Sequence, residues 1–308
     1  MARFKNSLKM EYKYIFIPYK GVNSKTDCPQ CGAKNSFSQY MDSETSEVLM
    51  GEYGRCDREE KCGYHYSPYE NPPSNSSGVK IKIPPKKDYY NTLPKKYVDE
   101  SLKNQFRDTL SLFLIQHFGK SGIDAIQVYK MGYSTIFGGG ATIFWQIDSN
   151  NEVRSGKIFK YEENGKRKKT PYPHISWVHT YLKDDYELKQ CFFGEHLLTE
   201  YPEKEVRVVE SEKTAIIMYA TSPEYVWLAS TQLRGLSEDK LKVIKDKKTI
   251  FIPDKGKAYE IWKERINEFK NPLWRVSKFM ENLSFEDDDD IADYILRKII
   301  TKSLVVPN

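Results

Sequence analysis

The stretch TIFIPDKGKAYEIWKERINEF, residues 249–269, predicts the fold of the C-terminal third of this 308-residue chain. An apolar, β-branched run ends on Asp254 and is followed by a segment with helical spacing. The same order of strand and helix occurs twice before it, in VRVVESEKTAIIMYA (206–220) and in YVWLASTQLRGLSEDKLKVI (225–244). Strands that alternate with helices over about 100 residues are typical of a mostly parallel sheet flanked by helices.

Acidic side chains follow two of these strands, Glu210 and Asp254. Because the carboxyl ends of parallel strands meet at one edge of a sheet, we expect both carboxylates to face the same crevice. Carboxylate oxygens are the ligands that Mg²⁺ and Mn²⁺ prefer, and these ions also bind phosphates. The acids at 287–290 and Asp293 come later, and the run alone is typical of the capped, solvated start of a helix. The sequence therefore predicts a divalent-metal site on Glu210 and Asp254.

Three segments carry a resemblance to the TOPRIM domain, namely VRVVESEKTAIIMYA, TIFIPDKGKAYEIW and DDDDIADYI. TOPRIM is the metal-binding catalytic fold of bacterial-type primases, topoisomerases and related nucleases. In that family an acid follows the first strand, an Asp-x-Asp pair follows the third, and further acids lie near the last helix. The resemblance implies that Glu210 and Asp254 are catalytic. It also implies that these two residues, with Asp290 and Asp293, hold Mg²⁺ or Mn²⁺.

Two residues depart from the TOPRIM pattern. Ser211 stands where the family usually has glycine, and Gly256 stands in place of the second aspartate. Gly256 removes one carboxylate from the metal site and weakens any two-metal arrangement. The sequence leaves three interpretations open: the late acids compensate, the site holds a single metal, or the enzyme is inactive.

Four of the five cysteines cluster near the N-terminus, at Cys28, Cys31, Cys56 and Cys62. Two thiolates in a C-P-x-C-G turn converge on one cation. Between the two pairs, SFSQYMD and EVLMGEYGR predict two short strands, which is the layout of a zinc ribbon. We expect these cysteines to hold one structural Zn²⁺, with His65 as the alternative to Cys62. Four buried free thiols are the competing interpretation.

Basic residues gather upstream of the predicted parallel sheet. ATIFWQID, VRSGKIFKYE and the turn ENGK predict an antiparallel hairpin that ends in GKRKK, residues 165–169. The residues predicted to contact a phosphate backbone or a nucleoside triphosphate are Lys157, Lys160, Arg167, Lys168 and Lys169. Lys213, one turn past Glu210, is predicted either to contact a phosphate as well or to pair with Glu210 or Glu212. A solvated hairpin tip is the alternative for GKRKK. Trp145, Tyr172 and Trp177 have the chemistry to stack on bases, but we expect most of them to lie in the core.

The resemblance extends upstream to VYKMGYSTIFGGGATIFWQIDSNNEVRSGKIFKYEENGKRKK, residues 128–169. This segment is similar to the basic, substrate-facing subdomain that precedes TOPRIM in replicative primases, and an N-terminal zinc module completes their order. The predicted fold is α/β (α+β overall). Its predicted parts are a zinc ribbon (1–70), a linker (71–95), a mixed α/β basic subdomain (96–200) and a TOPRIM sheet with flanking helices (201–308). Helical spacing is expected over 97–119 and 123–132.

Composition sets broad limits on the class of protein. Apolar residues make up 39% of the chain and charged residues 30%, which is typical of a globular protein and excludes wholesale disorder. A net charge of +5 permits a polyanionic partner without requiring one. No apolar run approaches the roughly 20 residues of a membrane span, and no secretory signal is evident, so a cytoplasmic location without membrane association is expected.

The sequence thus predicts a primase-like protein that carries out metal-dependent nucleotidyl transfer on single-stranded DNA with NTPs. The zinc ribbon is expected to contact the template, and the size suits the replication of a plasmid, phage or mobile element. The chain has no helicase-type P-loop, so any helicase is expected to be a separate partner. A TOPRIM nuclease and a catalytically inactive nucleic-acid-binding protein are the two alternatives.

Overall fold

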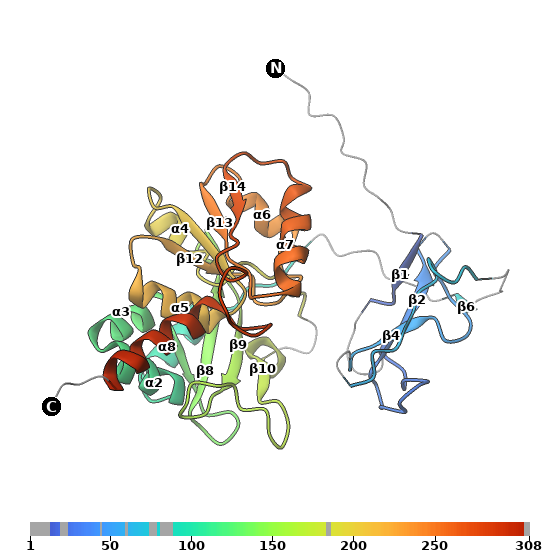
Figure 1. Cartoon of the computed structure of the whole chain (residues 1–308). Helices are drawn as coiled ribbons and strands as arrows, with labels where there is room; N and C mark the ends of the chain where they lie inside the picture. Colours follow the sequence, from blue (N-terminus) through green and yellow to red (C-terminus); the bar gives the residue numbers. More distant parts are fainter. Residues whose placement is uncertain are drawn as a thin grey trace. The chain divides into compact units, whose positions relative to one another are not determined.

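The structure is a computed structural model of the whole chain (Figure 1). It describes residues 13–18, 24–43, 45–58, 61–73, 79–80, 89–182 and 186–304. The chain forms two compact units, an N-terminal unit (Met1–Lys87) and a C-terminal unit (Asp88–Asn308), and each is considered by itself. Much of the predicted linker, at 74–78 and 81–88, lies outside the described residues.

Short antiparallel strands make up the N-terminal unit. They form a sheet in the order β5-β4-β2-β3-β6, and β1 pairs with β2 as well. Their bounds are β1 (Tyr14–Phe16), β2 (Phe37–Asp42), β3 (Glu47–Val48), β4 (Gly54–Cys56), β5 (His65–Tyr66) and β6 (Val79–Lys80). The first predicted strand is β2. The second is in fact two strands, β3 and β4, because the chain bends at residues 50–52.

Three helices open the C-terminal unit, α1 (Lys96–Leu102), α2 (Thr109–Phe118) and α3 (Lys120–Val128). The single helical stretch predicted over 97–119 is therefore wrong. The chain breaks at Phe106, whose φ is +72°, and Asp108 then caps α2 by accepting a hydrogen bond from the Ser111 N–H at 3.0 Å. The Asp108 carboxylate also accepts a hydrogen bond from the Thr142 hydroxyl, so the cap anchors α2 to the neighbouring strand.

An antiparallel sheet follows, in the order β10-β9-β8-β7. Its strands are β7 (Gly132–Ser134), β8 (Ala141–Ile147), β9 (Val153–Lys160) and β10 (Ile175–Trp177), and a short 3-10 helix, η2 (Val178–Tyr181), comes next. The predicted Asn-Gly turn after β9 is confirmed, since Gly165 has a φ of +73° and its N–H donates to the Glu162 carbonyl at 2.9 Å. A positive φ of this kind favours glycine over other residues.

The parallel sheet predicted for the last third of the chain is confirmed. Its order is β12-β11-β13-β14, and all three pairings are parallel. The strands are β11 (Val206–Val209), β12 (Val226–Ala229), β13 (Thr249–Phe251) and β14 (Trp274–Val276). The helices are α4 (Leu197–Glu200), α5 (Glu212–Thr221), α6 (Glu238–Val243), α7 (Lys257–Asn267) and α8 (Ile291–Leu304), with α8 beside α5 (Figure 1). No helix in the described part of the chain is both long and apolar enough to span a membrane.

One hydrophobic core joins the two sheets of the C-terminal unit. It contains Phe144 and Phe159 from the antiparallel sheet together with Val208 and Phe251 from the parallel sheet. Burial of apolar surface on this scale is the main force that holds the sheets together. The antiparallel sheet and the acid-bearing edge of the parallel sheet are therefore parts of one packed body.

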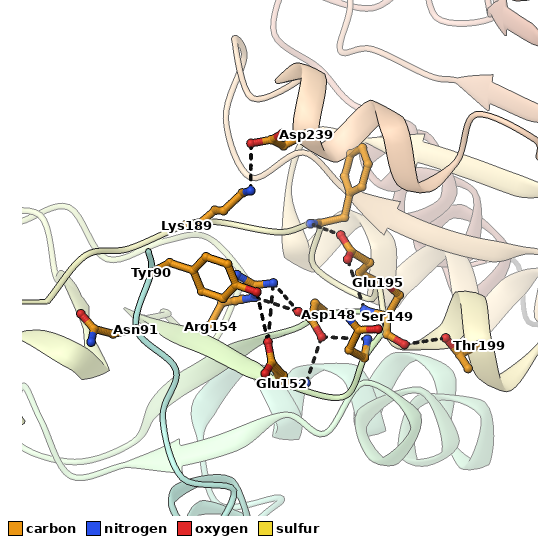
Figure 2. Close-up of polar contacts among 12 residues, drawn as sticks. Tyr90, Asn91, Asp148, Ser149, Glu152, Arg154, Lys189, Glu195, Thr199 and Asp239 are labelled. Atoms are coloured by element: carbon orange, nitrogen blue, oxygen red, sulfur yellow. Dashed lines mark hydrogen bonds and ion pairs between the residues drawn. The ribbon is translucent and has the colours of Figure 1, made fainter. Parts of the chain in front are cut away.

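A polar network reinforces this connection at the turn between β8 and β9 (Figure 2). The buried Asp148 carboxylate accepts a hydrogen bond from Arg154 Nε at 2.8 Å and also from its Nη2. Ser149 N–H donates to Glu195 Oε1 at 3.2 Å, and the Thr199 hydroxyl donates to the Ser149 carbonyl at 2.9 Å. Because Glu195 and Thr199 belong to the segment that leads into β11, these bonds fix the hairpin relative to the parallel sheet.

His196, in the same segment, predicts how the stability of the C-terminal unit depends on pH. Its buried ring bonds through Nε2 to the Val128 carbonyl at 3.2 Å, and burial, with the nearby Lys130 charge, lowers its pKa to about 4. Below a pH of about 6.5, the unfolded chain therefore binds a proton at His196, and the folded chain does not. The contribution of His196 to stability is therefore full above that pH and falls by on the order of 2 kcal/mol as the pH drops towards 4.

Urea unfolding at pH 5 and pH 7.5 measures this effect. All five tryptophans lie beyond residue 88, so tryptophan fluorescence reports on the C-terminal unit alone. The stability of His196→Gln relative to the wild type is expected to be higher at pH 5 than at pH 7.5, and His117→Gln, on α2, is the control. Equal relative stability of His196→Gln at the two pH values would contradict the assignment.

Candidate active site and zinc centre

Glu210 and Asp254 lie at the same edge of the parallel sheet. Each follows the carboxyl end of a strand, and the two strands, β11 and β13, are neighbours with Val208 opposite Phe251. Burial, followed by the charges of acids that include Glu210, raises the pKa of Asp254 to about 9. Burial also raises the pKa of Glu210, and the Arg167 charge opposes this rise. The two carboxylates are therefore close enough for their charges to interact.

Neither carboxylate has a hydrogen bond or an ion pair with any residue that the structure describes. A partly buried carboxylate without a partner is unfavourable when ionised, so a cation at this edge would stabilise both Glu210 and Asp254. The available donors are all oxygens, which is the donor set of Mg²⁺ or Mn²⁺ rather than of a soft metal. The chemistry of these residues fits a hard divalent ion.

The acidic segment 287–290 packs against the loop that follows β13. Lys255 N–H donates to the Asp289 carbonyl at 3.0 Å, and Asp288 N–H donates to the Lys255 carbonyl at 3.1 Å. After the effects of burial, the charge of Asp288 contributes to the raised pKa of both Glu210 and Asp254. The structure thus brings Asp288 to the edge of the sheet, a residue that the sequence analysis did not single out.

Asp290 and Asp293 bond mainly to the start of α8. Asp290 Oδ1 accepts the Asp293 N–H at 2.9 Å, and Asp293 Oδ2 accepts the Asp290 N–H at 3.1 Å. Asp290 Oδ2 accepts a hydrogen bond from the Thr214 hydroxyl on α5 at 2.5 Å. Their charges still contribute to the raised pKa of Asp254, after burial. These two acids therefore lie near the edge but hold the helix and the acidic segment in place.

Gly256 occupies a backbone conformation that is closed to a second aspartate. Its φ and ψ are +88° and −126°, a region that glycine alone adopts readily. A Cβ built at this position would lie 2.8 Å from Asp287 Oδ1, and the Gly256 N–H donates to Glu281 Oε1 at 2.8 Å. The Asp287 carboxylate therefore lies where the side chain of an acid at position 256 would begin.

The predicted basic residues divide into three groups. Lys157 Nζ lies 3.4 Å from Glu212 Oε1 and donates to the Thr231 carbonyl at 2.9 Å, while Lys213 Nζ donates to the Gly165 carbonyl at 3.4 Å. These two, with Arg167, border the acidic edge. Lys160 instead points to the Phe137 carbonyl, to which it donates at 2.7 Å. Lys168 and Lys169 follow the Asn-Gly turn and form no ion pair with a described residue.

The N-terminal unit brings together the four cysteines predicted to hold zinc, Cys28, Cys31, Cys56 and Cys62. Their sulfurs all lie within 4.8 Å of one another, and this is the one group of three or more converging metal-ligand side chains in the described ranges. The Sγ atoms of Cys28 and Cys62 are 3.8 Å apart, and those of Cys31 and Cys56 are 4.0 Å apart. A tetrahedron with Zn–S bonds of about 2.3 Å has edges of roughly 3.8 Å, so the thiols fit Zn²⁺.

His65, the alternative ligand, lies on the sheet instead. Its Nε2 is 3.0 Å from the Tyr40 hydroxyl, and its ring stacks on the Tyr40 ring with centroids 6.0 Å apart. Tyr40 itself stacks on Phe16 at 4.1 Å. The imidazole is thus part of an aromatic cluster, and Cys62 takes the fourth position in the group of thiols.

Comparisons with known proteins cover both units. Residues 12–77 match the family model of a zinc beta-ribbon finger, and residues 108–255 match the model described as "Domain of unknown function (DUF6371)". No curated protein sequence matches the chain.

Several solved primase structures are similar to this chain. The primase fragment of the bacteriophage T7 primase-helicase protein is 13% identical, with a TM-score of 0.44 over 94% of this chain and 100% of that one. The E. coli primase catalytic core is 13% identical, with a TM-score of 0.45 over 68% and 82%. The Aquifex aeolicus primase (zinc binding and RNA polymerase domains) is 11% identical, with a TM-score of 0.37 over 90% and 78%. The chain thus carries a four-cysteine zinc ribbon followed by a mixed α/β unit.

Proposed function

We propose that this chain is a primase-like nucleotidyltransferase that synthesises primers on single-stranded DNA. The observation that carries the proposal is a pair of carboxylates, Glu210 and Asp254, at the ends of neighbouring parallel strands, which have no hydrogen-bond or ion-pair partner among the described residues. Basic side chains from β9, from the segment after it and from α5 border these acids, as a reaction between phosphate-bearing substrates requires. The zinc ribbon supports the proposal as a second module, suited to contact with the template.

The residues of this site have separate roles in the proposal. Glu210 and Asp254 would hold Mg²⁺ or Mn²⁺, and the charge of Asp288 would add to the negative potential at this edge. When bound, the ion supplies positive charge for the phosphates and lowers the pKa of the attacking 3′-hydroxyl. Arg167 and Lys213 would contact the triphosphate, and Lys157 would stay oriented by Glu212. Asp290 and Asp293 would position the acidic segment through their bonds at the start of α8.

The test is a reaction of the full chain with a single-stranded template, NTPs and Mg²⁺ or Mn²⁺. Ladders of new oligonucleotide support the proposal. A shortened template would indicate a TOPRIM nuclease. Retardation of the template without any product would indicate an inactive nucleic-acid-binding protein. We further propose that a helicase acts as a separate partner, in the replication of a plasmid, phage or mobile element.

The salt dependence of oligonucleotide binding tests the role of Lys168 and Lys169 without any assay of catalysis. Lys168→Ala combined with Lys169→Ala is expected to weaken binding to an oligonucleotide at 50 mM salt, because two phosphate contacts are lost. The slope of log K against log salt should fall by about 0.7 for each lysine removed. Fluorescence anisotropy from 50 to 300 mM salt measures both quantities.

A matched pair of lysines controls for net charge. Lys242 and Lys245 are exposed and pair with Glu238 and Asp246, so replacing both with alanine should leave the slope unchanged. An affinity of the wild-type chain that does not change with salt would contradict the assignment of a polyanion partner.

A further inference from the structure

The segment between β9 and β10 returns to the sheet and exposes one tyrosine, Tyr172. Main-chain bonds anchor the segment, since Lys168 N–H donates to the Lys160 carbonyl at 2.8 Å and His174 N–H donates to the Lys168 carbonyl at 3.2 Å. Trp145 is core, with 1% of its surface exposed, whereas Tyr172 is 56% exposed. The expectation that the aromatics of this region lie in the core thus holds for Trp145 and not for Tyr172.

The ring of Tyr172 is supported on one face. It stacks on the ring of His174, with centroids 4.5 Å apart and an angle of 18° between the planes. His174 is buried, and its ring meets Phe137 edge-on at 5.3 Å. The buried His174 ring therefore holds the tyrosine ring in place from one side, and the other side is exposed to solvent. A flat ring held in this way offers a stacking surface at a small cost in conformational entropy.

The segment that carries this ring is rich in cations. Lys166, Lys168 and Lys169 form no ion pair with the residues that the structure describes. Arg167, in the same run, lies near enough to Glu210 for its charge to act on that carboxyl group. The segment therefore carries an exposed aromatic ring, several lysines and an arginine that lies close to the acidic edge.

We infer that Tyr172 stacks on a base of single-stranded nucleic acid while Lys168 and Lys169 contact the adjoining phosphates. The inference rests on the proposed function, because the bound strand would be the one that reaches Glu210 and Asp254. Aromatic stacking next to cations is how proteins bind single strands without regard to sequence. A partner that needed positive charge alone, such as an acidic peptide, would not require the supported ring.

Binding of the full chain to a 16-nucleotide thymidine strand, and to an abasic strand of equal length, tests the inference. Tyr172→Ala should weaken binding to the thymidine strand about tenfold, and Tyr172→Phe should bind within about twofold of wild type. Neither variant should change binding to the abasic strand, and the salt slope should stay as in wild type because no phosphate contact is lost. A strand with 5-iodouracil should cross-link to the peptide that contains Tyr172.

Tyr181 provides the control. It is 57% exposed, and Tyr181→Ala should bind both strands as the wild type does. Normal binding by Tyr172→Ala, or equal affinity of the wild type for thymidine and abasic strands, would overturn the stacking role while the proposed function stands. Failure of the wild-type chain to bind either strand would instead remove the proposed function itself.

Discussion

Asp254→Asn is expected to abolish primer synthesis, with a fall in rate of at least about 10²- to 10³-fold. Asparagine keeps the shape of the side chain and removes the negative charge that would hold the metal ion. Removing one fixed electrostatic contact to a transition state commonly lowers the rate by this factor. Losing a metal ligand should have at least this effect, because the ion stabilises several charges of the reacting groups. Primer synthesis at saturating NTP and Mn²⁺ measures the effect.

The same substitution should make the metal-free protein more stable. The pKa of Asp254 is raised to about 9, so between pH 4 and 9 the folded chain keeps a proton that the unfolded chain has released. The free energy of unfolding therefore falls as the pH rises through this range. Asparagine cannot ionise, so the variant does not lose this stability. Because Asp254 is partly solvated, we expect the gain in the free energy of unfolding to be only on the order of 2 kcal/mol at pH 8.

Tryptophan fluorescence during urea unfolding, with and without Mn²⁺, separates these effects. The wild type should gain stability from Mn²⁺ and Asp254→Asn should not, because ligands stabilise only the state that they bind. Asp246→Asn replaces an acid whose side chain is 85% exposed and should behave as the wild type in both assays. An Asp254→Asn variant that is active, or that gains as much stability from Mn²⁺, would remove Asp254 from the metal site.

Local patterns explain what the sequence could predict of this fold and site. The two cysteine pairs lie on short turns, so their spacing alone indicates that four sulfurs can meet. The strands that end on Glu210 and Asp254 alternate with helices, which places both acids at one edge whatever the details of packing. Such signals depend on a few neighbouring residues and on the general geometry of parallel sheets.

The remaining features depend on contacts between segments that are distant in sequence. Four consecutive aspartates have no periodicity, so nothing in the run distinguishes Asp288, which the main-chain bonds with Lys255 bring to the edge. At the break between α1 and α2, the cap residue Asp108 accepts a hydrogen bond from the Thr142 hydroxyl, which belongs to another element. Lys160 has the composition of a phosphate contact, but its bond to the Phe137 carbonyl became apparent only in the structure.

Gly256 shows how such contacts change the interpretation of a missing residue. As a departure from a pattern, it indicates a lost carboxylate and a weakened metal site. In the structure its backbone is restricted to glycine, and the Asp287 carboxylate lies 2.8 Å from the place of the absent Cβ. The acidic segment thus supplies negative charge at the position from which the second aspartate is missing. Gly256 is therefore compatible with an acidic site in which the segment 287–290 supplies the negative charge.

Replacing Cys28 and Cys31 with serine is expected to remove zinc and to unfold the N-terminal unit. Its hydrophobic core cluster contains Cys28, Phe37 and Cys56, with Cys62 and Tyr64 packed against it, so most of the cluster consists of the thiols themselves. Zinc contributes about 10–16 kcal/mol to small domains of this kind, which equals or exceeds the whole stability of a typical domain. Metal analysis should give about one zinc per wild-type chain and almost none in the variant.

Two further substitutions show which residues hold the ion. His65→Ala should keep its zinc, because the imidazole bonds to Tyr40 and lies outside the group of thiols. Cys191→Ala, in the C-terminal unit, should keep it as well. Tryptophan fluorescence of the Cys28 and Cys31 variant should be unchanged, since the tryptophans belong to the C-terminal unit, while protease should cut the N-terminal unit. Loss of zinc from His65→Ala, or its retention without Cys28 and Cys31, would contradict the four-thiol site.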